Sequence, residues 1–444
     1  MQVRKRSDLK ELIRERKALV SVIGLGYVGL PLVISFSKAG FPVLGFDIDD
    51  KKVSALNKGK SYILHIPSKE IKALLRGGKF SATSDFSQLK KPDVIIVCVP
   101  TPLDEHREPD MRYIVDTAEV IAKYLRKGQL VILESTTYPG TTDEVMIPIL
   151  EKSGLKATAD FFLGFSPERE DPGNPNFSTT QIPKVVAGID SRSSELATLL
   201  YSRAFEKVIP VSSTRAAEAV KLTENIFRAV NIALVNELKM IYTQFGIDIW
   251  EVIEAAKTKP FGFMPFYPGP GLGGHCIPID PFYLTWKARE YGYATRFIEL
   301  AGEINTNMPN YVIGALARSL NETKKPVKSS RILILGLAYK KNVADVRESP
   351  AFPIMKKLIS MGATVDYHDP YVASIPHMRN YPEFEGVKSI KWSAKNLAKY
   401  DAVMIVTDHS NVDYKFLVAH SRLVIDTRNA TKNVKRNRKR IKLA

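Results

Sequence analysis

The chain of 444 residues contains only two cysteines, Cys98 and Cys276. Two cysteines cannot build the disulfide framework of a secreted domain, and so few of them suit a reducing compartment. No apolar run approaches the roughly 18 residues that a membrane-spanning helix needs, and the charged segment 1–20 lacks the apolar core of a signal peptide. We therefore expect a cytoplasmic protein without a membrane-inserted segment.

Acidic residues are fewer than basic ones, which gives a formal net charge of +17. Part of the excess lies in segment 431–444, which has seven Lys and Arg residues and no acid. Such a tail can bind phosphates, nucleic acid or acidic surfaces, or it can be a solvated and partly disordered end. Because no aromatic interleaving or nucleic-acid motif accompanies the charge, we favour the solvated end and expect no nucleic-acid partner.

The remaining composition, 45% hydrophobic and 25% charged, is that of a globular protein, and the length predicts about three domains. Apolar runs alternate with amphipathic stretches through the first 170 residues, which indicates βαβ units and a parallel sheet. We expect buried strands in the runs ALVSVIG, FPVLGFD, DVIIVCVP, QLVILEST and DFFLGFS.

The pattern changes near residue 214, where a stretch without proline predicts one helix of about 30 residues that ends at Gly246. Proline and glycine dominate 258–281, helical sequence continues to about 321, and 322–330 has the composition of a linker. A second α/β pattern follows. We expect an α/β protein with boundaries at 1–211, 212–321 and 322–444, in which two Rossmann-like domains with parallel sheets flank an all-helical domain.

The first glycine motif follows the first apolar run directly. Gly24, Gly26 and Gly29 form G-x-G-x-x-G, in which glycine permits the tight turn and lets the backbone approach a pyrophosphate at a helix N-terminus. The next strand ends in Asp47, about 20 residues later, where a carboxylate accepts hydrogen bonds from the adenosine ribose and disfavours a 2′-phosphate. The motif therefore predicts NAD as cofactor, the alternative being an ordinary βα turn.

Candidate reactive groups lie far along the chain from this motif. Lys221 and Asn225 share a face of the long helix, and Cys276 lies in a glycine-rich loop four residues before Asp280. A buried lysine beside an amide can stabilise an oxyanion, although a surface lysine is the commoner case. Because there are too few ligands for a metal, we expect Cys276 to be a nucleophile and Cys98 to fill the core.

The segment FSPEREDPGNP, residues 165–175, follows a strand of the first sheet and carries Glu168 and Arg169. Loops at the carboxyl ends of parallel strands bind ligands, so a carboxylate here could order a water molecule. A charged surface turn is the alternative.

Taken together, these segments resemble the nucleotide-sugar 6-dehydrogenase family, which includes UDP-glucose dehydrogenase. The resemblance extends over nearly the whole chain, through GLGYVGLPL, VPTPL, ESTTYPGTT, SPEREDPG, VKLTENIFRAVNIALVNE, GPGLGGHCIPIDP and LGLAYKKNVADVRESPA. It implies an N-terminal NAD domain, a central helical domain that forms a homodimer or a higher homo-oligomer, a C-terminal UDP-binding domain and a role in polysaccharide biosynthesis.

The resemblance also implies a mechanism in which the C6 alcohol of a UDP-sugar is oxidised twice by NAD. Cys276 forms a thiohemiacetal and then a thioester, Lys221 and Asn225 bracket the oxyanion, and Asp280 acts with a water as base. The other implied residues are Thr136 and Glu168 at the water; Tyr27, Val28, Thr101, Thr136 and Arg347 at the cofactor; and Glu168, Arg169, Lys221, Asn225, Gly273 and Lys340 at the substrate.

Two departures from glucose-type members bear on the substrate. Pro172 stands where those members carry a second glutamate, and TKPFGFMPFYP replaces a segment that carries a substrate arginine. Both changes resemble the branch that acts on UDP-N-acetylhexosamines, most of all UDP-N-acetylglucosamine 6-dehydrogenases. The open alternatives are UDP-N-acetylmannosamine or UDP-glucose as substrate, a two-electron alcohol dehydrogenase with a structural Cys276, and a non-catalytic nucleotide-binding or RNA-associated protein.

Overall fold

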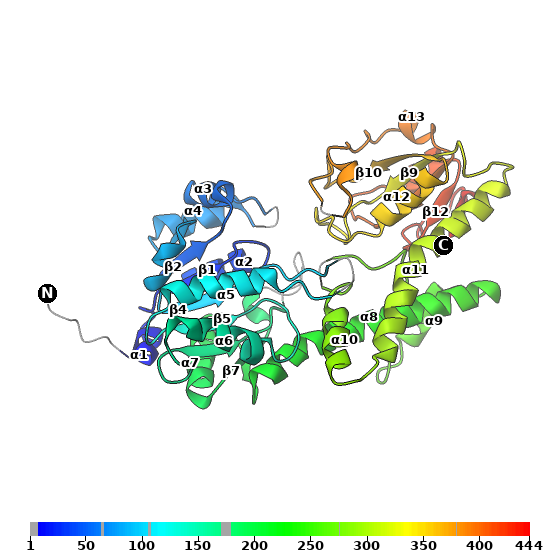
Figure 1. The fold of residues 1–444 in the computed structure, drawn as a ribbon. Coiled ribbons are helices and arrows are strands. Elements are labelled where there is room, and N and C mark those ends of the chain that lie inside the picture. The colour runs from blue at the N-terminus through cyan, green and yellow to red at the C-terminus, as the bar shows by residue number, and fades with distance from the viewer. Residues whose placement is uncertain (1–7, 64–65, 105–107, 170–178, 275, 379) are drawn as a thin grey trace. The chain divides into compact units, whose positions relative to one another are not determined.

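The computed structural model describes residues 8–63, 66–104, 108–169, 179–274, 276–378 and 380–444 (Figure 1). The chain forms two compact units. The first holds residues up to Glu224 together with Phe282–Tyr293, and the second holds Asn225–Pro281 together with Ala294–Ala444.

The first unit is built on a sheet of eight strands in the described residues, in the order β3-β2-β1-β4-β5-β6-β7-β8. Its strands are β1 (Val20–Ile23), β2 (Val43–Phe46), β3 (Phe80–Thr83), β4 (Val94–Val97), β5 (Leu130–Leu133), β6 (Phe162–Phe165), β7 (Lys184–Gly188) and β8 (Val208–Pro210). The five strands expected from the apolar runs are β1, β2, β4, β5 and β6. Both faces of each strand are buried in the sheet, which explains why each run is apolar throughout instead of alternating.

Helices cover both faces of this sheet (Figure 1). One hydrophobic cluster joins the sheet to α2 and α7, and a second joins its other face to α5 and α6. The helices are α1 (Leu9–Arg14), α2 (Gly29–Lys38), α3 (Asp50–Asn57), α4 (Ser68–Arg76), α5 (Arg112–Tyr124), α6 (Ile147–Leu150) and α7 (Ser191–Ser202), with a π-helix at Thr141–Met146. The carboxyl ends of β1, β2, β4 and β5 therefore meet at one edge, where ligands bind in such folds.

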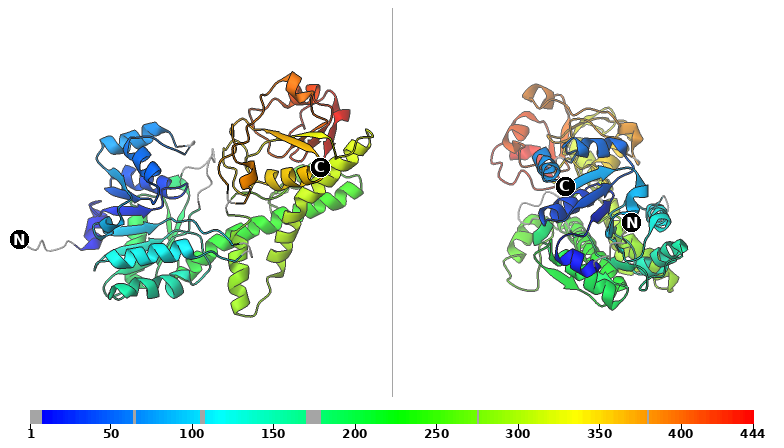
Figure 2. Two further views of the ribbon diagram at one scale, coloured as in Figure 1. Left: turned by 45° about the horizontal axis from the view of Figure 1, so that its top comes forward. Right: turned by 90° about the vertical axis from the view of Figure 1, so that its left-hand side faces the viewer.

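The expected long helix is α8 (Thr214–Gln244), an unbroken helix of 31 residues (Figure 2). Gly246 follows it with a φ of 71°, a left-handed conformation that glycine adopts readily at helix ends. The helical stretch that follows the Pro/Gly-rich segment is not continuous, because it consists of α10 (Asp280–Glu290) and α11 (Arg296–Asn321), with Gly292 between them at a φ of 75°.

The second unit contains the other end of α8, then α9 (Ile249–Ala256), α11 and a five-stranded parallel sheet in the order β10-β9-β11-β12-β13. Its strands are β9 (Arg331–Leu335), β10 (Thr364–His368), β11 (Ala402–Ile405), β12 (Val424–Asp426) and β13 (Ile441–Leu443), and its other helices are α12 (Ala351–Ser360), α13 (Ala394–Leu397) and α14 (Tyr414–His420). The chain thus contains two α/β sheets with helical segments between them, as the sequence predicts.

Two features differ from expectation. Strand β7 runs antiparallel to β6, so the first sheet is not wholly parallel. The basic end is also ordered: β13 pairs with β12, and Arg440 donates hydrogen bonds to three carbonyls, those of Val418, Ala419 and Ser421. Apolar residues interleaved with the lysines and arginines, such as buried Val434, explain why this end packs.

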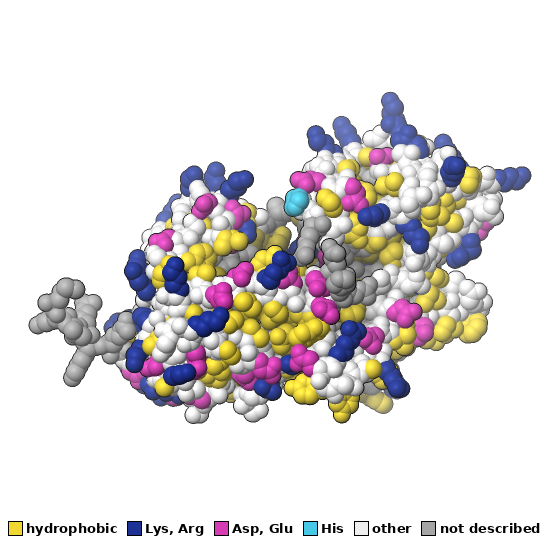
Figure 3. Space-filling view, in the orientation of Figure 1, with side chains coloured by type: hydrophobic (Ala, Val, Ile, Leu, Met, Phe, Trp, Pro, Cys, Tyr) yellow, Lys and Arg dark blue, Asp and Glu magenta, His cyan; other side chains and the backbone are white. Residues whose placement is uncertain are grey.

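Lys and Arg side chains lie among Asp and Glu over the face drawn in Figure 3, so the basic excess is not confined to one segment. Within the described residues, no helix combines the length and the hydropathy needed to cross a membrane.

Candidate active site

The glycine motif after β1 uses each of its glycines differently. Gly24 has a φ of 91°, and a Cβ there would lie 2.4 Å from the carbonyl oxygen of Cys98. A Cβ on Gly29 would lie 1.9 Å from the carbonyl oxygen of Gly24, so only glycine lets α2 pack this close to the strand. By contrast, a Cβ on Gly26 would have no described atom within 4 Å. The turn is closed against the protein at two glycines and open at the middle one.

The carboxylate of Asp47 lies at the end of β2 beside this turn. It accepts hydrogen bonds from the backbone N–H of Leu25 at 2.9 Å and of Asp49 at 3.0 Å, and the ammonium of Lys52 lies 3.6 Å away. No described side chain caps the N-terminus of α2. Within its first turn, the N–H of Leu30 donates to the carbonyl of Gly26 at 3.1 Å and Pro31 has no N–H, so the N–H of Gly29 remains for an anion. The open Gly26, the uncapped helix and the acid at the end of β2 fit a dinucleotide with free ribose hydroxyls.

The other cofactor candidates lie in different places. Tyr27 and Val28 are half-buried in the same turn, and Thr101 is buried in the segment that follows β4. Arg347 belongs to the second unit, where its exposed guanidinium pairs with Asp345 at 2.6 Å.

Thr136 follows β5 in a turn that α8 supports. The carboxylate of Glu218 on α8 accepts hydrogen bonds from the N–H of Gly140 at 2.6 Å, and from the N–H and hydroxyl of Thr142 at 2.9 and 2.7 Å. Burial raises the pKa of Glu218 to about 7, although these hydrogen bonds oppose the shift. Glu218 thus fastens the turn of Thr136 to the helix that carries Lys221.

Lys221 lies one turn beyond Glu218 and is only 8% exposed. On the same side of α8, Ala217 and Val220 pack into the core beneath the sheet. Among the residues that the structure describes, the ammonium of Lys221 has no hydrogen bond or ion pair. A buried cation of this kind is suited to an anionic partner from outside the chain.

Glu168 and Arg169 follow β6. Glu168 is 9% exposed and pairs with the ammonium of Lys184 at 2.9 Å, so it is not part of a solvated turn. Arg169 pairs with Glu224 of α8 at 2.5 Å. Glu170, Asp171 and Pro172 lie outside the described residues, as does His275.

The thiol loop belongs to the second unit. The carbonyl of Cys276 accepts a hydrogen bond from the N–H of Asp280 at 2.8 Å, which places the cysteine one turn before the start of α10. The amide of Asn225 donates to the carboxylate of Asp280 at 2.6 Å, and both side chains are buried. The structure therefore brings together Asn225, Asp280 and the backbone of Cys276.

The glycines before Cys276 rest on the segment that follows β9. A Cβ on Gly274 would lie 2.8 Å from the ring of Tyr339, and one on Gly273 would lie 2.7 Å from the Cβ of the same tyrosine. The N–H of Gly274 also donates to the carbonyl of Arg347 at 3.0 Å. The loop thus needs glycine in order to lie against the segment that carries half-buried Lys340.

The candidate residues fall into two groups. Gly24, Gly26, Tyr27, Val28, Gly29, Asp47, Thr101, Thr136, Glu168, Arg169 and Lys221 belong to the first unit, and Asn225, Gly273, Cys276, Asp280, Lys340 and Arg347 belong to the second. Lys221 and Asn225 are linked through α8 itself.

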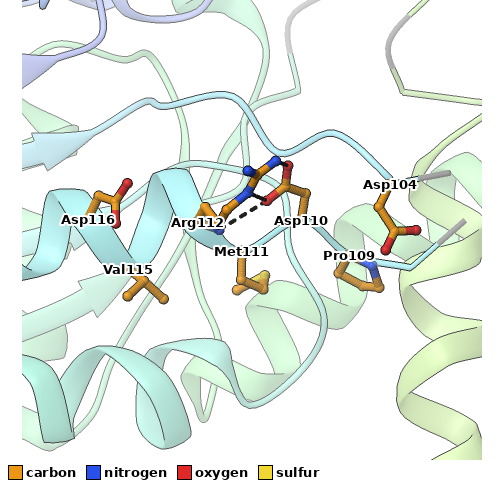
Figure 4. A pocket seen from close by; sticks show the side chains of 7 residues that line it. All are labelled: Asp104, Pro109, Asp110, Met111, Arg112, Val115 and Asp116. Carbon is orange, nitrogen blue, oxygen red and sulfur yellow. Dashed lines mark hydrogen bonds and ion pairs between the residues drawn. The ribbon is translucent and has the colours of Figure 1, made fainter. Parts of the chain in front are cut away.

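A depression of about 450 Å³ lies beside the start of α5 (Figure 4). Its cation, Arg112, already forms a bidentate pair with Asp110 at 2.8 and 2.7 Å. We assign no ligand to it. It is lined by Asp104, Pro109, Asp110, Met111, Arg112, Val115 and Asp116.

Several supporting residues were not among the candidates predicted from the sequence. Glu134 and Lys184 are charged residues at the ends of apolar strands, and Glu218 is a carboxylate on an otherwise apolar face of α8. A charge next to a buried run was the available signal, but its partner could not be identified without the fold.

Three family domains match the chain in succession. They are the NAD binding domain of the UDP-glucose/GDP-mannose dehydrogenase family over residues 18–205, its central domain over 215–307 and its UDP binding domain over 333–433.

Relatives with different sugars in their names match nearly the whole chain. The UDP-N-acetyl-D-glucosamine 6-dehydrogenase of Pseudomonas aeruginosa is 39% identical, over 88% of this chain and 90% of that protein. The NDP-N-acetyl-D-galactosaminuronic acid dehydrogenase of Ralstonia solanacearum is 33% identical, over 92% and 95%. The solved UDP-D-ManNAc dehydrogenase of Pyrococcus horikoshii superposes with a TM-score of 0.84 at 33% identity, over 93% and 96%.

The glycine turn with its acid, the order of the three family domains and these relatives agree. The chain belongs to the UDP-glucose/GDP-mannose dehydrogenase family and is an NAD-dependent nucleotide-sugar dehydrogenase.

Proposed function

We propose that this enzyme oxidises the C6 hydroxyl of a UDP-N-acetylhexosamine to the carboxylate in two successive steps, with UDP-N-acetylglucosamine as the first candidate. The observation that carries the proposal is the loop in which Cys276 precedes Asp280 by one turn while Asn225 holds the carboxylate. The 39% identical relative named for UDP-N-acetyl-D-glucosamine supports the choice of sugar.

Cys276 is the nucleophile in this proposal. Its sulfur adds to the C6 aldehyde to form a thiohemiacetal, which the second oxidation converts to a thioester. Water then adds to the thioester carbon, the carbon–sulfur bond breaks and the sugar carboxylate leaves. Asp280 accepts the proton of that water, and Asn225 keeps the carboxylate oriented through the 2.6 Å hydrogen bond.

Lys221 stabilises the oxyanion that develops at C6. Its burial favours this role, because a charge in a poorly solvated site interacts more strongly with an anion than it would in water. Thr136 and Glu168 order the attacking water. Glu218 keeps the turn of Thr136 attached to α8 and thereby fixes the helix that bears Lys221.

The cofactor is held by the chain's own turn residues. The backbone of Gly24, Gly26, Tyr27, Val28 and Gly29 receives the pyrophosphate, and Asp47 accepts hydrogen bonds from the ribose hydroxyls. Thr101, Thr136 and Arg347 complete the cofactor contacts in this proposal. NAD, when bound, is the hydride acceptor of both oxidations.

Lys340 and Arg169 bind the substrate in this proposal, and Gly273 admits the sugar beside the thiol. Lys340 follows β9 in the UDP binding domain, where an ammonium can pair with a phosphate. Arg169 is held by Glu224 and by the carbonyl of Pro183 at 2.8 Å, so its guanidinium is fixed before substrate arrives.

The deciding experiment is a panel of UDP-N-acetylglucosamine, UDP-N-acetylmannosamine, UDP-N-acetylgalactosamine and UDP-glucose with NADH counted per sugar. We expect the highest kcat/KM with UDP-N-acetylglucosamine and two NADH per molecule. A preference for UDP-N-acetylmannosamine or UDP-glucose would correct the substrate. One NADH per sugar would instead favour a two-electron alcohol dehydrogenase, in which Cys276→Ser keeps full turnover.

We also propose that α8 forms a homodimer contact. Phe227, Leu234 and Ile241 are 48%, 48% and 41% exposed and recur every seven residues along this helix. Such a stripe is typical of a helix that packs against another copy. Light scattering should give at least twice the mass of one chain, and Leu234→Lys should lower that mass.

We further propose domain boundaries at 211 and 321 and a cytoplasmic location.

A further inference from the structure

Three charged side chains meet inside the first unit beside the carboxyl ends of β5 and β6. Lys184 opens β7, Glu134 follows β5 directly and Glu168 follows β6. Their exposures are 3%, 0% and 9%. Charges this deeply buried need partners, because burial removes their hydration without replacing it.

The ammonium of Lys184 supplies both pairs. It lies 2.7 Å from one oxygen of Glu134 and 2.9 Å from one oxygen of Glu168. The second oxygen of Glu134 accepts a hydrogen bond from the hydroxyl of Tyr201, and the second oxygen of Glu168 accepts one from the N–H of Arg169 at 2.7 Å. Both carboxylates are thus fixed at each oxygen.

The antiparallel direction of β7 creates this arrangement. In the ladder, Phe165 pairs with Ala187, and the same register extended by three residues sets Glu168 opposite Lys184. Had β7 run parallel to β6, its first residue would lie at the other edge of the sheet. The strand reversal therefore brings Lys184 to the edge of the sheet where Glu134 and Glu168 lie.

We propose that Lys184 is the positioning residue that holds Glu168 in place as an ionised carboxylate, and that Glu134 competes for the same ammonium and so tunes this hold. The proposal rests on the proposed function, in which Glu168 orders the water that releases the thioester. Lys184 and Glu134 themselves do not touch substrate in this assignment.

The other described groups named beside this triad are paired or neutral. Arg169 is neutralised by Glu224. Burial raises the pKa of the Cys98 thiol and of the Tyr201 hydroxyl well above their usual values, so both are neutral. Burial would lower the pKa of Lys184, but the attraction of Glu134 and Glu168 outweighs it, and the lysine remains charged.

Glu134 is a weaker acid than an ordinary glutamate. Burial, assisted by repulsion from Glu168, raises its pKa to about 7 against the attraction of Lys184. Near neutral pH the ammonium of Lys184 is therefore shared between two carboxylates. When Glu134 takes up a proton, the attraction between Lys184 and Glu168 becomes stronger. Removal of the Glu134 charge and removal of the Lys184 charge must then shift the pKa of Glu168 in opposite directions. A merely structural role would not produce opposite shifts.

The first test measures Glu168 directly and needs no turnover. Protein labelled with ¹³C at the glutamate carboxyl is titrated by NMR, with Glu168→Gln used to assign the resonance. We expect Lys184→Met to raise the pKa of Glu168 by about 1–3 units, and Glu134→Gln to lower it by about one unit. Shifts in the same direction, or no shift in either variant, would overturn the proposal.

The second test follows the reaction. In Lys184→Met we expect a burst of two NADH per site and then slow turnover, because the thioester forms but its hydrolysis is impaired. The steady-state rate should fall about tenfold or more, KM should change little, and the acid limb of the pH profile should move to higher pH. Lys184→Arg should restore the rate in large part.

Controls separate the possible failures. Lys152 forms an exposed pair with Glu119 at 2.9 Å, and Lys152→Met should leave both readouts unchanged. If Lys184→Met does not fold, Glu134→Gln alone decides the sign of the shift. Absence of NADH with every sugar would refute the proposed function, while the NMR titration would still decide whether Lys184 controls Glu168.

Discussion

The turns after β1 and β9 are two versions of one structure, GLGYVG in the first unit and GLAYKK in the second. Each opens with a left-handed glycine, Gly24 or Gly336, with φ of 91° and 86°. A Cβ on either would lie 2.4 Å from a carbonyl oxygen, that of Cys98 or Thr407. The first position of the turn is therefore constrained in the same way in both units.

The remaining positions differ. Ala338 and Lys341 of the second turn occupy the places of Gly26 and Gly29 of the first. The acid that follows the second strand also has different partners. Asp47 accepts two backbone N–H groups, whereas the carboxylate of Asp369 accepts those of Leu337, Ala338, Tyr371 and Val372 at 2.7–3.2 Å and the ring of His409 at 3.0 Å.

Under the proposed function, this difference gives one architecture two kinds of ligand site. The first turn leaves Gly26 open, and Asp47 accepts a ribose hydroxyl in the proposed function. In the second turn the chain's own hydrogen bonds engage Asp369, and lysines stand at positions 340 and 341. Both turns need a left-handed glycine at their first position. The residues around each turn determine which ligand it binds in this proposal.

The largest expected effect comes from exchanging the two acids for asparagine. Asp369→Asn turns an amide NH₂ toward backbone donors that need an acceptor, so the free energy of unfolding should fall by about 2–4 kcal/mol. Asp47→Asn should cost at most about 1 kcal/mol but weaken NAD binding tenfold or more. Urea denaturation and NAD calorimetry measure the two effects. Equal destabilisation in both variants would mean that the acids have the same role.

The second prediction exploits the open glycine. A Cβ at position 26 meets no described atom within 4 Å, and the position needs no left-handed backbone. For Gly26→Val the unfolding free energy should therefore change by less than about 0.5 kcal/mol. The valine would occupy the approach of the pyrophosphate, and NAD affinity should fall about 100-fold, or about 2.7 kcal/mol.

Ala338→Gly is the matched change in the second turn. It should cost about 0.5–1 kcal/mol of stability and leave NAD binding unaltered. If Gly26→Val still binds NAD at the original affinity, the turn does not hold the pyrophosphate.

The sequence predicts the shared part of the comparison well. Buried parallel strands appear as apolar runs, and a glycine after such a run, with an acid after the next, identifies the first turn. The direction of β7 could not be predicted from the sequence. The run KVVAG does not indicate which strand it pairs with, or whether that pairing is parallel or antiparallel. The partners of Glu134 and Lys184 depend on that direction, and so they too escaped prediction.

The prediction that the basic segment 431–444 is a solvated end was wrong for a different reason. A high density of Lys and Arg favours a solvated segment, yet a strand needs only a few alternating apolar residues and a free sheet edge. Strand β12 supplies that edge, and Ile441 and Leu443 alternate with Lys442 in β13. Whether an edge is free is a property of the folded sheet and cannot be derived from composition.

The third prediction concerns pH, to which the two units should respond oppositely. Burial raises the pKa of Glu134 and Glu218 to about 7, so the folded first unit holds more protons than its unfolded chain between about pH 4.5 and 7. Its unfolding free energy should therefore fall, by on the order of 1–3 kcal/mol, as the pH rises through that window.

The second unit contains His368, whose pKa burial lowers below its usual value. Folded, it holds fewer protons than the unfolded chain near and below about pH 6.5, so stability should rise with pH there. Hydrogen exchange of β5 and β11 amides at pH 5.5 and 7.5, corrected for intrinsic rates, measures both slopes. Glu218→Gln should flatten the slope of the first unit only, and parallel slopes in both units would contradict the assignment.

The smallest effect should come from the lysines of the second turn. Lys340 occupies the place of Val28 and is proposed to bind the UDP-sugar, so Lys340→Ala should raise KM for the sugar about tenfold, or about 1.4 kcal/mol, without changing NAD affinity. Its neighbour Lys341 makes an exposed pair with Asp408 at 3.4 Å, and Lys341→Ala should change neither KM nor, by more than about 0.5 kcal/mol, stability. Initial-rate kinetics with each ligand varied in turn distinguishes the two lysines. A loss of NAD affinity in Lys340→Ala would place this lysine at the cofactor, and the two turns would then share a ligand instead of dividing two between them.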